Sequence, residues 1–303
     1  MAISFPRFAS LTAVALLALP IASLLCAAGC GRHAPPADPS LALLPDSVAA
    51  PRGFAVPDSA RIPGGALGAS IRRGRALVLA TRDSLPAHVS SRLACTNCHL
   101  DAGTRAGSSA WVGTFATFPQ YNARAGRVIT IEDRVNECMR RSLNGVPLDP
   151  NGRDMIDIVS YMAFLSSGMP QGRRAPWLGY RTLAPRTGDA GAGARVFAQN
   201  CVRCHGTAGQ GGVGIPPLWG PGSFAIGAGM SRVRTAAAFI RWNMPRDRPG
   251  TLTDQQAYDV AAFVLSHPRP DTPGKEHDWP NGDAPMDAAY ATLAGHSAGP
   301  HRR

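Results

Sequence analysis

The chain reads Cys95-Thr-Asn-Cys98-His99 and, further on, Cys201-Val-Arg-Cys204-His205, two copies of the pattern C-x-x-C-H. Two thiols at this spacing can bond to the two vinyl groups of a haem, and the adjacent histidine then lies under the iron. A C-x-x-C pair alone also occurs in dithiol redox motifs and zinc sites. With only 7 Cys in 303 residues, two complete copies by chance are improbable. The sequence therefore predicts two covalently bound haem c groups.

One motif in each half of the chain predicts a mainly α fold made of two tandem cytochrome c domains, each with one covalently bound haem. The segment Asp157-Ile-Val-Ser-Tyr161 is similar to Asp259-Val-Ala-Ala-Phe263, which indicates two copies of one fold. We expect Thr253 and Gln256 to form the capping box of the last helix. The predicted divisions are a first domain at 61–170, a linker at 171–192, a second domain at 193–270 and a partly ordered tail at 271–303.

The N-terminus has the order of a secretory signal: a positive start, an apolar run, and small residues before Cys30. We expect residues 1–29 to be this signal and residues 30–60 to be a tether rich in Pro, Ala and Ser. The ending Gly29-Cys30 resembles a lipobox, so acylation of Cys30, simple cleavage and an uncleaved anchor all stay open. Each version predicts a periplasmic protein, which is also where haem c is attached.

The charge is strongly positive, with 31 Lys+Arg against 20 Asp+Glu, and Lys275 is the only lysine. Such a balance indicates an anionic ligand or an acidic partner. Nucleic acid would fit the charge alone, but haem attachment and export argue against it, so we expect no nucleic-acid partner.

The sixth iron ligand distinguishes an electron carrier from an enzyme, and spacing offers a candidate for each haem. Cys138 lies 39 residues after His99, and Met244 lies 39 residues after His205. In two copies of one fold these sulfurs would occupy equivalent places above the two irons. The alternatives are Met230 for the second haem, and Met139, Met155 or His88 for the first.

The residues around Cys138 suit an anion. Arg134 and Ser142 stand four residues before and after Cys138, and on a helix they share its face. Guanidinium groups match oxyanions in charge and in donor geometry. Arg140 and Arg141 are explained equally well as a solvated helix face. Near the second motif, Pro216-Pro217-Leu218 resembles the loop of small monohaem cytochromes c, and we expect the Pro217 carbonyl to accept a hydrogen bond from His205.

Several segments between about residues 65 and 285 share a pattern with one family. They are Cys95-Thr-Asn-Cys98-His99, Phe118-Pro-Gln-Tyr121, Glu132-Asp-Arg-Val-Asn-Glu-Cys138, Arg141-Ser-Leu-Asn-Gly145, Pro217-Leu-Trp-Gly220, Gly227-Ala-Gly-Met230 and Asn243-Met-Pro245. These residues resemble thiosulfate dehydrogenases, dihaem cytochromes c that join two thiosulfate ions into tetrathionate, or run the reverse. The resemblance implies that Cys138 is the catalytic haem ligand and that Arg124, Arg134 and Ser142 bind substrate.

The same resemblance implies that the second haem passes electrons to a small external cytochrome c. Some family members place a lysine before the methionine of this haem, but this chain has Asn243 there. We therefore expect plain His205/Met244 ligation and a high potential at the second haem. Two other classes remain open: an electron carrier without its own substrate, and a dihaem peroxidase. The arginines around Cys138 argue against an electron carrier without its own substrate.

Overall fold

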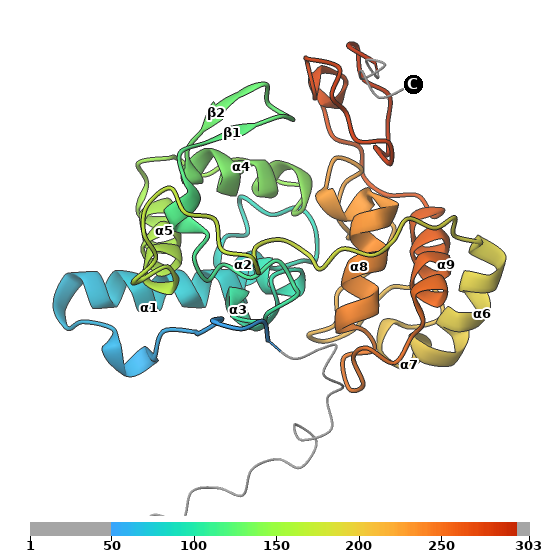
Figure 1. Cartoon of the computed structure of the whole chain (residues 1–303), viewed down its shortest axis with the longest axis horizontal. Coiled ribbons are helices and arrows are strands. Elements are labelled where there is room, and N and C mark those ends of the chain that lie inside the picture. The colour runs from blue at the N-terminus through green and yellow to red at the C-terminus, as the bar shows by residue number, and fades with distance from the viewer. Residues whose placement is uncertain (1–49, 296–303) are drawn as a thin grey trace, which may run out of the picture. The chain divides into compact units, whose positions relative to one another are not determined.

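The computed structural model describes residues 50–295 (Figure 1). The predicted signal, Cys30 and most of the tether lie outside the described residues. Helices dominate the described part, and its one sheet is an antiparallel pair of β1 (Gln120–Asn122) and β2 (Arg127–Ile129). The predicted mainly α class is confirmed. No helix among residues 50–295 is long and apolar enough to cross a membrane.

Two helices cross at a glycine in the first half. There α1 (Gly65–Leu79) packs on α5 (Arg153–Leu165) (Figure 1). A Cβ added at Gly74 would lie 1.9 Å from the backbone oxygen of Asp157, so only glycine permits this approach. The Asp157 carboxylate accepts hydrogen bonds from Ser70 and Arg73 of α1, which fixes the crossing point.

The second half repeats this arrangement with α6 (Ala190–Asn200) against α9 (Asp254–Leu265). A Cβ at Gly193 would lie 2.0 Å from the backbone oxygen of Asp259. The Asp259 carboxylate accepts a hydrogen bond from the Asp189 backbone N–H at 2.9 Å, just before α6. The matching glycine and aspartate confirm that the two halves are copies of one fold.

A further helix in each half stands opposite the C-x-x-C-H motif. In the first half it is α4 (Ile131–Arg141), which begins at a capping box formed by Thr130 and Asp133. In the second half it is α8 (Val233–Asn243), and Met244 follows it directly in extended conformation. The predicted capping box of Thr253 and Gln256 opens α9, as expected.

The remaining elements are short. They are the α-helical turns α2 (Thr81–Ser84), α3 (Leu100–Gly103) and α7 (Val202–His205), and the 3₁₀ turns η3 (Ser59–Arg61), η4 (Cys95–Asn97), η5 (Phe115–Thr117), η6 (Gly229–Ser231) and η7 (Lys275–His277).

Residues of the predicted linker and of the predicted tail are buried. Between the halves, Ala175 is buried and the Trp177 indole donates a hydrogen bond to the backbone oxygen of Val112 at 2.8 Å. Beyond α9, Asp278 and Trp279 are both buried. The chain that follows α9 therefore contributes to the folded body well past residue 270.

Candidate haem and substrate sites

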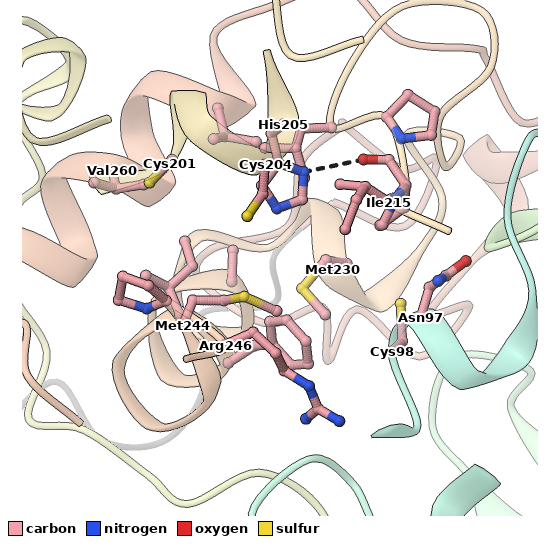
Figure 2. Close-up of a pocket in the computed structure, with 18 of the residues that line it drawn as sticks. Asn97, Cys98, Cys201, Cys204, His205, Ile215, Met230, Met244, Arg246 and Val260 are labelled. Carbon is pink, nitrogen blue, oxygen red and sulfur yellow. Dashed lines mark hydrogen bonds between the residues drawn. The ribbon is translucent and has the colours of Figure 1, made fainter. Parts of the chain in front are cut away.

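A cavity of about 340 Å³ in the second half lies next to the second motif (Figure 2). Cys201, Cys204 and His205 line one side, and both Met244 and Met230 line the other. Figure 2 shows the two thioether sulfurs directed into the space beside the His205 ring. The structure thus brings both candidate methionines to this cavity.

The His205 ring is held from behind. Its Nδ1 lies 3.0 Å from the backbone oxygen of Pro216, and burial lowers the pKa of the imidazole. With Nδ1–H donating to this carbonyl, Nε2 stays free to bind a metal. The prediction of Pro217 was wrong by one residue, because adjacent prolines in a sequence do not tell which of their carbonyls faces the ring.

The first half has a cavity of about 220 Å³ at the first motif. Cys95, Cys98 and His99 line it, and the His99 Nδ1 lies 2.8 Å from the backbone oxygen of Ser109. Burial lowers the pKa of His99 to about 4, aided by the positive charge of Arg134 and opposed by the Ser109 contact. This imidazole is therefore neutral near pH 7, as an iron ligand must be.

Helix α4 supplies the opposite wall of this first cavity. Its Cys138 lines the cavity together with Arg134 and Ser142, so the predicted i±4 cluster is brought together. The Arg134 guanidinium pairs with Glu137 at 3.0 Å, and its pKa is raised chiefly by the charge of Cys138. The Arg134 side chain is 45% exposed, which leaves it free to meet a ligand.

The three alternative ligands proposed for the first haem lie at different places relative to the first cavity. Met139 is buried and lines the same cavity as Cys138. Met155 is fully buried in the core of the first half and does not line the cavity. His88 is also outside the lining, with its Nδ1 3.2 and 3.1 Å from the backbone oxygens of Val146 and Pro147.

Two arginines lie elsewhere than the sequence predicts. Arg124 is not among the residues that line the first cavity; its Nη1 donates to the backbone oxygen of Gly227 at 2.6 Å. Arg174, which the sequence analysis missed, does line it. Arg174 belongs to the arginine-rich stretch between the halves, where no periodic pattern distinguishes one arginine from the next.

The residues present fit two haem c groups. The five cysteines of the described chain form no disulfide, and burial raises the pKa of the Cys95 and Cys98 thiols to about 11 and about 12. Each cavity combines the two free cysteines of its motif with an imidazole whose Nδ1 is already engaged. Within residues 50–295, the buried donors Arg269 Nη1 and Trp242 Nε1 have no hydrogen-bond partner, and neither residue lines one of the two cavities.

Comparisons with known proteins agree with this arrangement. Residues 87–171 match the family model described as SoxA/TsdA, cytochrome c domain, and residues 188–264 match Cytochrome C oxidase, cbb3-type, subunit III. A thiosulfate dehydrogenase of Psychrobacter arcticus is 42% identical over 77% of this chain and 73% of its own length. One from Allochromatium vinosum is 44% identical over 71% of this chain and 84% of its own length. The chain belongs to the thiosulfate dehydrogenase family.

A solved thiosulfate dehydrogenase (TsdBA) of Marichromatium purpuratum has the same fold, with a TM-score of 0.71 and 38% identity over 75% of this chain. This chain covers 52% of that protein, about half its length. The predicted membership of the thiosulfate dehydrogenase family, the two cytochrome c domains and the two covalent haem c groups are confirmed, and the chain is an enzyme.

Proposed function

We propose that this chain oxidises two thiosulfate ions to tetrathionate at the first cavity and delivers the electrons through the second to a small external cytochrome c. The observation that carries the proposal is the shared cavity wall of Cys138, Arg134 and Ser142, facing the motif of His99. A chain that only carried electrons would need no reactive thiol beside a half-exposed guanidinium.

In this proposal the motif residues of each half hold one haem, and four side chains complete the iron sites. His99 and Cys138 are the ligands in the first half, and His205 and Met244 those in the second. The bound haems supply one-electron redox chemistry, one electron for each. A thiolate ligand favours a low potential and a thioether a high one, so electrons run from the first half to the second.

The substrate is a dianion, and the first cavity offers donors for it. The Arg134 guanidinium and the Ser142 hydroxyl flank Cys138 along one helix face. Charge-assisted hydrogen bonds from such a fork hold the sulfonate oxygens and direct the outer sulfur towards Cys138.

The reaction divides into two sulfur transfers. In the first, the Cys138 thiolate bonds to the outer sulfur of one thiosulfate, and two electrons leave as the S–S bond forms. In the second, the outer sulfur of another thiosulfate attacks that outer sulfur, forming tetrathionate and releasing the Cys138 thiolate. The sum is two thiosulfate to one tetrathionate plus two electrons, and no proton is consumed. Tetrathionate reduction is the same sequence reversed.

The test is rapid mixing of the oxidised dihaem protein with thiosulfate, with tetrathionate measured as product. We expect reduction of both haems and one tetrathionate for every two electrons passed to ferricytochrome c. Electron paramagnetic resonance of the oxidised protein should show one thiolate-ligated signal and one His/Met signal. Two His/Met signals, or no haem reduction by thiosulfate, would contradict the proposal. Oxidation of the reduced protein by peroxide alone would favour a peroxidase.

We also propose that the protein acts in the periplasm after removal of residues 1–29. The N-terminal order of charge, apolar run and small residues supports export. Mass spectrometry of the mature protein distinguishes the two forms, because a lipid on Cys30 adds the mass of its acyl chains whereas simple cleavage leaves a free N-terminus.

A further inference from the structure

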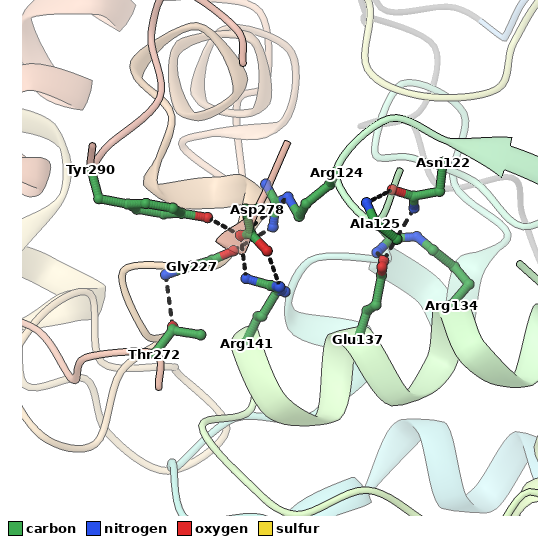
Figure 3. Close-up of polar contacts among 10 residues, drawn as sticks. All are labelled: Asn122, Arg124, Ala125, Arg134, Glu137, Arg141, Gly227, Thr272, Asp278 and Tyr290. Carbon is green, nitrogen blue, oxygen red and sulfur yellow. Dashed lines mark hydrogen bonds and ion pairs between the residues drawn. The ribbon is translucent and has the colours of Figure 1, made fainter. Parts of the chain in front are cut away.

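The first half contacts the second at several places, and one of them lies at the end of α4 (Figure 3). There the Asp278 carboxylate, from the chain after α9, accepts hydrogen bonds from Arg141, with Nη2 to Oδ1 at 2.6 Å and Nη1 to Oδ2 at 2.7 Å. A different contact reaches the segment that carries Met244. It joins residues on both sides of this methionine to one loop of the first half, residues 101–109.

Asn243 makes the first of these contacts, directly before Met244. It is the last residue of α8 and is buried. Its Nδ2 donates to the backbone oxygen of Gly107 in the first half at 3.2 Å, and to that of Phe239 one turn earlier at 3.1 Å. Since both hydrogens of this buried nitrogen are engaged, the amide ties the end of α8 to the loop 101–109.

Arg246 makes the second contact, two residues after Met244. Its Nη2 donates to the Asp101 carboxylate, whose other oxygen lies 3.5 Å from Nη1 of Arg105. The side chains of Arg246 and Asp101 are 43% and 47% exposed, so this ion pair contributes less than the buried amide. Together the two contacts hold the chain to the first half on either side of Met244.

The loop 101–109 that receives both contacts also belongs to the site of His99. Asp101 follows His99 by two residues, and the His99 Nδ1 lies 2.8 Å from the backbone oxygen of Ser109, at the other end of the loop. Asp101, Ala102 and Ser109 have φ angles of 57°, 56° and 53°, in the left-handed region that residues other than glycine rarely adopt. Such a conformation persists only where surrounding contacts impose it. One firmly held loop therefore serves the histidine of the first site and the methionine of the second.

We propose that Asn243 is a positioning residue for Met244, and that the loop 101–109, through Asn243 and Arg246, sets how firmly Met244 is held at the second iron. The inference rests on the proposed function, because it takes His205 and Met244 as the ligands there. Met244 stands in extended chain just past a helix end, so contacts of its neighbours keep its sulfur in the cavity. Residues of the first half thereby stabilise the ligation of the second.

The decisive variant is Asn243→Leu in the full dihaem chain, which removes the amide and keeps a similar bulk. The probe is imidazole, which binds a ferric haem whose methionine has left. We expect the Kd of imidazole at the second haem to fall about tenfold, because Met244 leaves more readily once the bond to Gly107 is lost. Electron paramagnetic resonance assigns the site, since the His/Met signal should be replaced while the thiolate-ligated signal stays.

The exposed contact gives a second test, which also serves if Asn243→Leu folds poorly. Arg246→Gln and Asp101→Asn should each lower the Kd of imidazole at the second haem by about threefold. The double variant should equal either single one, because both remove the same ion pair. Fully multiplicative effects, or no effect of Asp101→Asn, would show that the first half does not act on Met244 through Arg246.

The matched control is Asp278→Asn, which breaks a contact between the halves far along the chain from Met244. It should leave the Kd of imidazole within about 1.5-fold of the wild type. An equal fall in Asp278→Asn and Asn243→Leu would mean that any loosening of the two halves frees Met244, and an unchanged Kd in Asn243→Leu would overturn the inference outright. Failure of the proposed ligation looks different, since the oxidised wild-type protein would then show no His/Met signal.

Discussion

The two halves share a scaffold and differ in what stands opposite the histidine. Each has a helix pair crossing at a glycine, at Gly74 and Gly193, and a histidine held by a backbone carbonyl. In the first half the opposite sulfur is a thiol on a helix rich in charged residues, and in the second it is a thioether in extended chain after a helix rich in alanine. A duplicated fold can thus acquire two roles by changing one wall of one cavity.

The largest effect on activity is expected when the sulfur ligand of the first half is changed to the one of the second half. Cys138→Met replaces the thiolate by a thioether, so the first haem should gain a His/Met signal and a higher potential. Because no thiolate is left to take up the outer sulfur, kcat should fall by a factor of at least about 1,000, or about 4 kcal/mol of barrier.

The control for that variant is Met139→Leu, a change of similar volume in the same cavity. It should keep activity within about twofold, since Met139 packs and does not react. If Met139→Leu abolished activity and Cys138→Met did not, the rival ligand Met139 would take the place of Cys138.

The helix crossing that the two halves share can be tested by measuring the stability of glycine variants. Gly74→Ala and Gly193→Ala each place a methyl group about where a backbone oxygen of the facing helix already lies. We expect each to lower the free energy of unfolding by about 3 kcal/mol, measured by denaturant titration of the holoprotein. Gly64→Ala is the control, because a Cβ there meets nothing within 4 Å. Tolerance at one of the two crossings would show that the two helix pairs are not equivalent.

The sequence predicted most of this scaffold because its signals are local. A few adjacent residues suffice to recognise a C-x-x-C-H motif or the capping box at Thr253. The same holds for the similar short segments that begin at Asp157 and Asp259. The helix end near Arg141 and the later segment with Asp278 meet only in the folded chain, so no local pattern reveals their contact. Composition predicted a partly ordered tail, and Asp278 and Trp279 within it are buried.

The candidate site was predictable to the same degree. Arg134, Cys138 and Ser142 lie on one helix face, and helical periodicity alone places them together. Arg174 lines the cavity from an irregular segment, where periodicity gives no direction, whereas Arg124, in the turn between two short strands, does not line it. The structure is needed for residues that reach a site from loops.

A smaller effect is expected at the anion contact of the first half. Arg134→Gln removes a charge-assisted donor from the cavity wall, so the KM for thiosulfate should rise about tenfold, or about 1.4 kcal/mol. Arg140→Gln, on the exposed side of the same helix, should change KM by less than about twofold. Steady-state reduction of ferricytochrome c measures both, and equal effects would show that general charge, and not the Arg134 contact, binds the anion.

The last prediction distinguishes the two methionines of the second half. Both line its cavity, but Met244 is tied to the scaffold by its own backbone N–H, which donates to Ile240 at the end of α8. With Met244→Leu the second haem should lose its His/Met signal and its high potential, and electron delivery should slow by about tenfold. Met230→Leu should leave potential and signal unchanged and only perturb packing. The reverse pattern would make Met230 the ligand, and the equal spacing of the two sulfurs from their histidines would then have no structural meaning.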